Sequence, residues 1–245
     1  MTIRRILKLT GSDVTDFLQG LVTNDVTKIS DGLVYAAMLT PQGKYIADFF
    51  LARADDGVLL DVAESHADML STRLNMYKLR ADLSIETTDL HMHRGLGPCP
   101  ADGFDDPRHP ELGWRAYREA PASDDGTDWT ALRVAHKIPE TGVELTPDTF
   151  VLEVGFEALS GVDFRKGCYV GQEVTARMKH KTELRKGLAQ VHVDGPADTG
   201  AEITASGKPV GTLLSRSGDL ALAYIRFDRA TGDMQAGDAT LTLDR

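Results

Sequence analysis

The sequence contains few of the features that mark disulfide-rich, cluster-binding or membrane-spanning proteins. Only two of its 245 residues are cysteines, Cys99 and Cys168. They allow at most one disulfide and cannot alone hold a four-thiolate iron–sulfur cluster. No apolar run approaches the roughly 18–20 residues of a membrane span, and the N-terminus lacks the apolar core of a signal peptide. We therefore expect a cytoplasmic protein with reduced thiols and no membrane contact.

Sequence patterns for common nucleotide and hydrolase chemistry are also missing. There is no Gly-x-x-x-x-Gly-Lys-[Ser/Thr] loop and no convincing Gly-x-Gly-x-x-Gly after an expected strand, and Ser160 lacks a nucleophile-elbow context. The formal net charge of −10 argues against general nucleic-acid binding. His91 and His93 have no further ligands nearby, so we expect no metal site. Nothing in the sequence demands more than a monomer.

One segment departs from this acidic background. Residues 165–186 contain seven Lys and Arg against two Glu, and Cys168 lies among them between Gly167 and Gly171. A basic segment with a thiol and two glycines indicates a site for an anionic small molecule. Cations and a helix N-terminus lower the pKa of a thiol, and Arg165 and Lys166 precede Cys168. The alternative is a buried structural thiol, since free cysteine is often buried.

The order of expected elements predicts an α+β fold. Apolar residues at three- and four-residue spacings predict a helix over 64–80, and a shorter helix follows Ser12 and ends near Gly20. A helix covering one face of an antiparallel sheet gives such an order. Strands are expected at 33–39, 45–53, 57–62 and 83–88.

The second half of the chain changes in character along its length. A loop-rich stretch over 95–128 contains one expected strand near 114–118, and helices are expected at 128–137 and from about Gly171. From Gly187 onward, short β-type runs alternate with turns, which predicts a β-barrel or sandwich of about 60 residues. We place the boundary at 184–187 and expect one region over 1–185, with an α+β lobe at about 33–118, followed by a barrel domain over 186–245.

Three carboxylates could take part in chemistry or binding. Glu153 stands within an apolar run, so it is either paired and buried or on an outward face. Its two acceptor oxygens, like those of Glu173, would suit the paired N–H donors of a heterocycle such as a pterin, although Glu173 is better explained by a helix N-terminus. Asp48 could position or deprotonate an amine, whereas a surface role is the simpler interpretation. Arg177 and its basic neighbours could bind anionic groups or be only solvated.

The residues Lys166-Gly167-Cys168-Tyr169-Val170-Gly171-Gln172-Glu173, continued by Ala176-Arg177, closely resemble the signature of the YgfZ-type folate-binding proteins. These are relatives of the glycine cleavage T-protein, an aminomethyltransferase, and of mitochondrial iron–sulfur assembly factors. Residues 17–26, which include Asn24, and residues 39–48 resemble two further segments of that family. With the C-terminal β segment, the resemblance covers nearly the whole chain.

The resemblance implies a three-lobed arrangement with a ferredoxin-like α+β domain and a C-terminal β-barrel, and tetrahydrofolate as the cofactor. It implies a role in assembling or repairing iron–sulfur proteins, including enzymes that modify tRNA. The signature cysteine corresponds to Cys168, the catalytic aspartate of the T-protein to Asp48, and its pterin-facing glutamate to Glu153. The remaining candidates for folate binding lie in the matched segments: Asn24, Lys166, Tyr169, Gln172, Glu173 and Arg177.

The chain departs from the T-protein in two respects. It is considerably shorter, and T-proteins lack a cysteine at the position of Cys168. The preferred hypothesis is therefore a folate-binding iron–sulfur assembly factor that uses Cys168. The alternatives are a folate-dependent aminomethyltransferase that uses Asp48, and a folate-sensing scaffold that needs neither residue.

Overall fold

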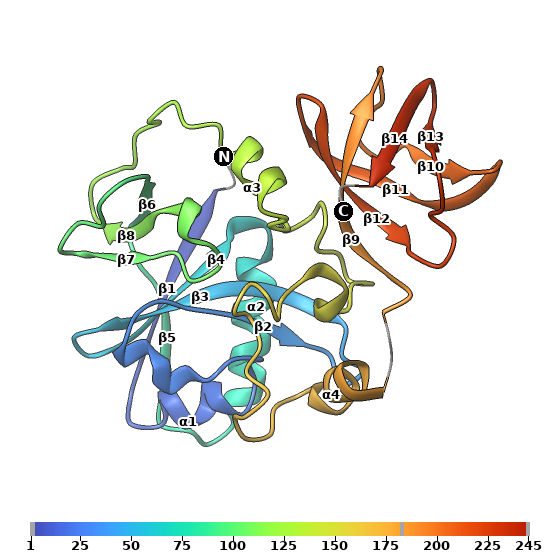
Figure 1. Ribbon diagram of the computed structural model, residues 1–245. Helices are drawn as coiled ribbons and strands as arrows, with labels where there is room; N and C mark the ends of the chain where they lie inside the picture. Colours follow the sequence, from blue (N-terminus) through green and yellow to red (C-terminus); the bar gives the residue numbers. More distant parts are fainter. Residues whose placement is uncertain (1–2, 182–183, 244–245) are drawn as a thin grey trace. The chain divides into compact units, whose positions relative to one another are not determined.

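A five-stranded antiparallel sheet is the centre of the first of two structural units (Figure 1). The computed structural model describes residues 3–181 and 184–243. The first unit comprises Met1–Thr127 and Glu157–Val174, and the second comprises Asp128–Phe156 and Thr175–Arg245. The strand order in the sheet is β2-β3-β4-β1-β5, with bounds β1 Arg4–Thr10, β2 Val34–Leu39, β3 Tyr45–Ala54, β4 Gly57–Ala63 and β5 Ser84–Thr87.

One face of this sheet packs in an apolar core. Phe49 and Leu51 of β3 lie in the same cluster as Leu70 and Leu74 of α2 (Glu64–Lys78), because alternate strand residues share a face. Burying each such side chain contributes about 1.5–3 kcal/mol. The short elements α1 (Val14–Gln19) and η1 (Val26–Ser30) add Val14, Leu18 and Val26 to this cluster.

The start of α1 differs from the prediction. Asp13 rather than Ser12 occupies the N-cap position, and it makes no side-chain cap bond. Its carboxylate instead accepts a hydrogen bond from the backbone N–H of Asp82, at 2.8 Å. A contact across 69 positions of sequence therefore replaces the local cap that the sequence suggested.

The opposite face of the sheet carries a buried network of charges. Asp61 of β4 accepts hydrogen bonds from Arg4 Nε at 2.6 Å, from Arg115 at 3.2 Å and from Tyr117 Oη at 3.2 Å. Arg115 Nε also donates to Asp106 Oδ2 at 3.0 Å, and Arg108 forms a bidentate ion pair with the same carboxylate. The guanidinium groups of Arg4, Arg108 and Arg115 lie 5.7, 4.8 and 3.9 Å from the centre of the Phe50 ring.

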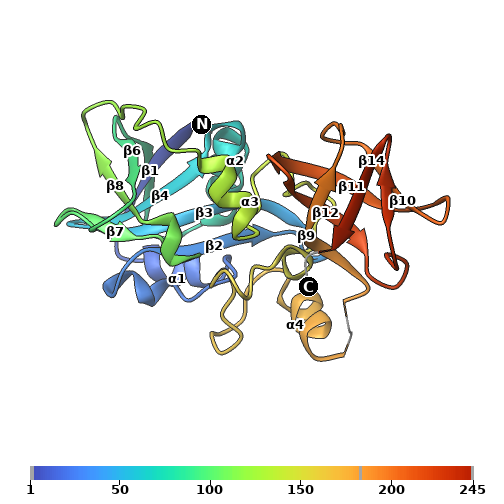
Figure 2. The ribbon, with the colours of Figure 1, turned by 45° about the horizontal axis from the view of Figure 1, so that its top comes forward.

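A second, three-stranded sheet supplies Arg115 and Tyr117. Its order is β6-β8-β7, with β6 at His91–Gly95, β7 at Gly103–Asp105 and β8 at Trp114–Arg118, and it is drawn in green in Figure 2. The expected strand at 114–118 is confirmed, but β1, β6, β7 and the short helix η2 (Pro110–Leu112) were not predicted. The strands β1 and β6 each carry several charged or histidine residues, so neither shows the apolar pattern that is typical of a buried strand.

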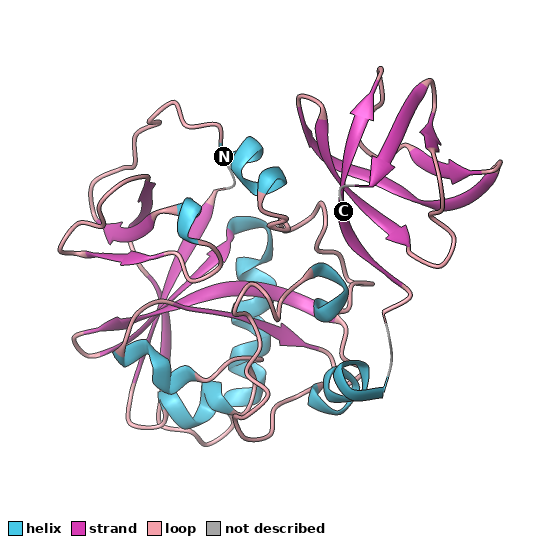
Figure 3. Cartoon of the chain, viewed as in Figure 1, coloured by secondary structure: helices cyan, strands magenta, loops and turns pink. Residues whose placement is uncertain are grey.

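The second unit contains a closed six-stranded barrel, visible as magenta arrows in Figure 3. The alternation of buried residues in β9, such as Val191 and Val193, places one side of each strand inside the barrel. The barrel alternative is therefore the correct one. The barrel order is β10-β11-β12-β9-β14-β13, with bounds β9 Lys186–Asp194, β10 Glu202–Ala205, β11 Lys208–Ser217, β12 Leu220–Arg226, β13 Met234–Ala236 and β14 Ala239–Leu243.

Two further elements of this unit precede the barrel: α3 (Trp129–Ala135) and the short helix η3 (Val151–Val154). The helix α4 (Gln172–Lys181) begins in the first unit and continues in the second. None of the helices in the described part of the chain has the length and apolar character needed to cross a membrane. The predicted boundary at 184–187 stays a prediction. Thr182 and Glu183 of the basic segment lie outside the described residues.

Candidate functional site

A strap over residues 157–172 is bound by hydrogen bonds to the segment that follows α1. Thr23 Oγ1 donates to the carbonyl of Gly161 at 2.6 Å, and the backbone N–H of Asp163 donates to the carbonyl of Thr23 at 3.0 Å. Asn24 Nδ2 donates to the carbonyls of Ser160 and Tyr35, at 2.6 and 2.8 Å. Asn24, a predicted cofactor-binding residue, thus connects the strap to β2. Its role in ligand binding stays a prediction.

Lys166 is the main anchor of the signature loop. Its ammonium donates to the carbonyls of Gln19 and Val22 at 2.8 and 2.6 Å and lies 5.0 Å from the centre of the Tyr169 ring. The residue is only 8% exposed. Burial lowers its pKa to about 8, although Asp25 and Asp163 act in the opposite direction. These contacts of Lys166 and Tyr169 fix the loop, and the roles of both residues in ligand binding stay predictions.

Cys168 stands between these two buried anchors and is exposed. Cys99 is also a free, exposed thiol, but partial burial and the nearby carboxylates of Asp105 and Asp102 raise its pKa. A cysteine whose neighbours on both sides are held in place presents its sulfur at a defined position. The structural alternative of a buried thiol is thus wrong for Cys168.

Gly171 closes the loop against the turn between β2 and β3. A Cβ at Gly171 would lie 2.6 Å from the carbonyl oxygen of Thr40 and 3.0 Å from Leu39 Cβ, and Gly171 has a φ of +86°. Gly43 in the opposing turn has a φ of +77°, and a Cβ there would lie 2.8 Å from Val174 Cβ. Two glycines are needed because two backbones meet here. Gly167, by contrast, has open space at its Cβ position.

Replacement by alanine is expected to affect Gly171 and Gly167, the two glycines of the signature, differently. Gly171→Ala should lower the free energy of unfolding by about 1–3 kcal/mol. The positive φ is unfavourable for alanine, and its methyl group would clash with the carbonyl oxygen of Thr40. Gly167→Ala should change it by less than about 0.5 kcal/mol and is the matched control. Urea unfolding of both variants measures the difference, and an equal loss in the two would contradict this description of the loop.

The remaining predicted residues of the signature lie at the start of α4. Gln172 Nε2 donates to the carbonyl of Gly167 at 3.4 Å, so it too supports the loop. Glu173 is exposed in the first helical turn, where a carboxylate complements the helix dipole. Arg177 is exposed one turn further along. Their roles in ligand binding stay predictions.

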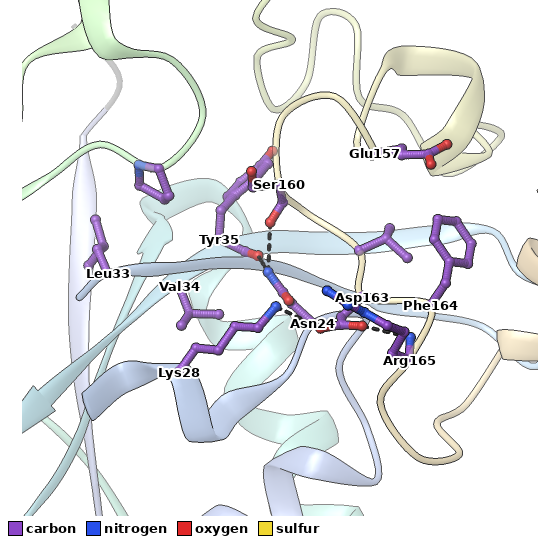
Figure 4. A pocket seen from close by; sticks show the side chains of 12 residues that line it. Asn24, Lys28, Leu33, Val34, Tyr35, Glu157, Ser160, Asp163, Phe164 and Arg165 are labelled. Atoms are coloured by element: carbon purple, nitrogen blue, oxygen red, sulfur yellow. Dashed lines mark hydrogen bonds and ion pairs between the residues drawn. The ribbon is translucent and has the colours of Figure 1, made fainter. Parts of the chain in front are cut away.

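A cavity of about 440 Å³ opens beside the strap, entirely within the first unit (Figure 4). The ammonium of Lys28 contacts Asp163 Oδ2 at 2.6 Å across it. Burial raises the pKa of Asp163, but the contact with Lys28 and the N–H groups of Arg165 and Lys166 outweigh this and lower it. Cys168 is not part of the lining, which consists of Asn24, Lys28, Leu33, Val34, Tyr35, Pro107, Glu157, Ser160, Val162, Asp163, Phe164 and Arg165.

Of the residues that line the cavity, only Asn24 was a predicted site residue, and two of the others stand out. Ser160 has a φ of +54°, a strained conformation for serine that directs its carbonyl to Asn24. Arg165 is exposed, and its guanidinium has no ion-pair partner among the described residues. Its position directly before the signature was the only signal in the sequence.

Asp48, predicted as a catalytic candidate, is buried on β3 with 4% of its surface exposed. Its two oxygens accept hydrogen bonds from the hydroxyls of Tyr35 and Tyr45, at 3.1 and 2.7 Å. Burial and the Asp48 carboxylate raise the pKa of Tyr35 well above its ordinary value. The interpretation of Asp48 as a surface residue is therefore wrong.

Glu153, the predicted pterin contact, is 7% exposed on η3, and the paired alternative is correct. The Tyr224 hydroxyl donates to Glu153 Oε2, and Lys186 Nζ lies 3.8 Å from Oε1. Burial and this hydrogen bond raise the pKa of Tyr224. These contacts join η3 to the barrel strands β9 and β12 within the second unit. Among the described residues, no group of three or more His, Cys, Asp or Glu could hold a metal ion.

Comparison with solved structures shows the fold. Glycine cleavage system aminomethyltransferase T from Bartonella henselae superposes with a TM-score of 0.79 over 99% of this chain and 83% of its own, at 13% identity. The chain has the aminomethyltransferase fold. Residues 185–245 match the family model "CAF17, C-terminal beta-barrel domain". The predicted α+β class with a C-terminal barrel is confirmed.

Curated relatives include proteins named iron–sulfur cluster assembly factor IBA57 or its homolog, mitochondrial. The one from Mycosarcoma maydis is 32% identical over 75% of this chain and 54% of its own length. The proteins from Mus musculus and Homo sapiens are each 29% identical over 94% of this chain and 78% of theirs. Because these relatives are mitochondrial by name, they overturn the expectation of a bacterial-type cytoplasmic protein.

Proposed function

We propose that the protein is an iron–sulfur cluster assembly factor whose working group is the thiol of Cys168. The observation that carries the proposal is an exposed sulfur between two buried anchors, Lys166 and Tyr169. Thiolates are the usual protein ligands of iron–sulfur clusters. A chain with two cysteines can offer a cluster only part of its ligands, so the cluster is cargo shared with a partner. The names of the curated relatives support the same function.

Complementation tests this proposal. The chain is expressed in a strain in which the gene for this protein has been deleted. The activities of iron–sulfur enzymes in that strain are compared with those of enzymes without clusters. Restoration confined to the iron–sulfur enzymes is the expected result. A strain whose iron–sulfur enzymes stay inactive although the chain is folded and abundant contradicts it.

Within this function we propose the YgfZ-type branch, with iron–sulfur enzymes that modify tRNA among the clients. The support is the resemblance of the Lys166–Glu173 signature, extended by Ala176 and Arg177. The three-lobed T-protein has no cysteine at this position of the signature. Iron–sulfur assembly proteins or their clients are the proposed partners.

We propose tetrahydrofolate as the cofactor, held in the cavity beside the strap. The volume of about 440 Å³ falls within the range of ligand sites. Phe164 offers a ring face, Glu157 offers carboxylate oxygens to ring N–H donors, and Arg165 offers a planar donor pair to a carboxylate tail. Bound tetrahydrofolate would supply the capacity to carry a one-carbon unit.

Arg165→Ala is expected to weaken tetrahydrofolate binding about tenfold or more, because a charged hydrogen bond contributes about 1.5–3 kcal/mol. Arg53→Ala, which removes an exposed arginine of β3 outside the cavity, is the matched control and should bind as the natural chain does. Calorimetric titration measures both, and Glu153→Gln in the same series tests the predicted pterin contact. Equal affinities for the Arg165 variant and the natural chain would place folate elsewhere.

Aminomethyl transfer is the second candidate, favoured by the fold and by the fixed position of Asp48. The two tyrosine hydroxyls orient its carboxylate. Formation of methylenetetrahydrofolate from an aminomethylated carrier protein, abolished in Asp48→Asn, would establish this activity. Absence of turnover would leave the assembly function alone.

A further inference from the structure

The turn after α2 holds a leucine in a costly backbone conformation. The backbone N–H of Ala81 donates to the carbonyl of Lys78 at 2.8 Å and closes a four-residue turn. Leu79 follows Lys78 with φ +45° and ψ −103°. These angles are close to the second position of a type II′ turn, which glycine dominates because it has no Cβ.

The side chain of Leu79 gains nothing from the fold in return. It is 88% exposed, and Met76, one helical turn earlier, is 71% exposed. The buried side of α2 consists of Ala67, Leu70 and Leu74, so the core is complete without Leu79. A strained backbone that carries an apolar side chain into water is a feature expected where the side chain serves a partner.

Cations surround this apolar group. Arg73, Lys78 and Arg80 flank Met76, Tyr77 and Leu79, and none of the three forms an ion pair within the described ranges 3–181 and 184–243. The chain as a whole carries a formal charge of −10. The local excess of positive charge therefore complements an acidic surface.

We infer that this α2-turn patch, made of Met76, Tyr77 and Leu79 with Arg73, Lys78 and Arg80, docks a partner protein that presents an apolar pocket rimmed by carboxylates. The backbone conformation of Leu79 holds its side chain in a defined place. Such a placement favours insertion into a pocket of matching shape, whereas it gives no advantage in a fluid bilayer. The inference rests on the proposed function, since the partner is an iron–sulfur assembly protein or client.

Two variants at one position test the patch. Leu79→Ala removes the side chain and keeps the strain, whereas Leu79→Gly removes both. In the strain that lacks the gene, both are expected to lower the restored iron–sulfur enzyme activity about fivefold or more, in the range of hot-spot truncations. Leu96→Ala removes another exposed leucine and should restore activity within about twofold of the natural chain. The Tm of Leu79→Gly should be unchanged or up to about 4 °C higher.

Each opposite result overturns the inference. Full restoration by Leu79→Gly shows that the patch is dispensable, and a Tm several degrees lower shows that Leu79 serves the fold. Loss of binding to phosphatidylserine vesicles in Leu79→Gly identifies a membrane as the occupant, and loss of self-association in sedimentation identifies a second copy. If the natural chain itself restores nothing, the proposed function fails. In that case a photo-cross-linker placed at position 79 in intact cells tests whether the patch docks a protein. A discrete protein adduct that is abolished by Arg80→Glu supports the inference. Absence of such an adduct contradicts it.

Discussion

Replacing Cys168 with serine is expected to reduce the restored iron–sulfur enzyme activity about tenfold or more. Loss of a group that merely supports a metal ligand costs about 10–100-fold in metal affinity, and loss of the ligand itself costs at least as much. Serine keeps the size of the side chain but replaces the soft thiolate, which clusters require. The measurement is iron–sulfur enzyme activity in the strain that lacks the gene, complemented with each variant.

Cys99→Ser is the matched control, because Cys99 is the other free, exposed cysteine. The Cys99→Ser variant should restore activity fully, because the pKa of the Cys99 thiol is raised and Cys99 does not lie in the anchored signature loop. Neither variant removes a buried contact, so both should unfold at the urea concentration of the natural chain. A Cys168→Ser chain that restores full activity would remove the thiol from the mechanism.

Asp61→Ala is expected to cost about 3–5 kcal/mol of unfolding free energy, the range for breaking a buried ion pair from one side. The Asp61 side chain is completely buried, and it accepts hydrogen bonds from Arg4, Arg115 and Tyr117. Without it, the guanidinium of Arg4 remains buried without its carboxylate. Urea unfolding followed by circular dichroism measures the loss.

Asp56→Ala provides the control for charge alone. Asp56 pairs with Lys8 at the surface, and loss of this pair should cost no more than about 1 kcal/mol. If the two aspartate variants lose similar free energy, the buried network is not a main source of stability.

The same network predicts an acid dependence of stability. Burial acts to raise the pKa of Asp106, but Arg108 and Arg115 outweigh it and hold the pKa well below its usual value. The folded state therefore binds this proton less readily than the unfolded state. The stabilisation is fully present above about pH 4 and is lost as the pH falls toward the lowered pKa. Asp106→Asn should flatten that part of the pH profile.

Local periodicity predicted the elements whose burial depends on apolar residues. The helix over 64–80 and the strands at 33–39 and 45–53 are present with nearly the predicted bounds. The strand β1 was missed because Arg4 and Arg5 resemble a solvent-exposed segment. Arg4 is paired with the carboxylate of Asp61, 57 positions away, and no local pattern reports such a pairing.

The same limit applied to the candidate site. The sequence left open whether Glu153 was paired, and the answer depended on Tyr224, 71 positions away. The basic segment was interpreted as an anion site, which stays a prediction. The hydrogen bonds of Lys166 to the carbonyls of Gln19 and Val22, more than 140 positions away, could not be predicted from it. The exposure of Cys168 agrees with the predicted reactive thiol, whereas Arg165 and Ser160 became candidates only once the cavity was seen.

The most direct measurement is the activity that an apo iron–sulfur enzyme gains when the purified chain is added together with iron, sulfide and a cluster-carrying assembly protein. It is made in the Cys99→Ala variant before and after Cys168 alone is alkylated. Iodoacetamide modification of one sulfur leaves the polypeptide otherwise unchanged. If the exposed sulfur is the working group, one alkyl group per chain abolishes the activation without changing the Tm. Activation that survives complete alkylation of Cys168 contradicts the account.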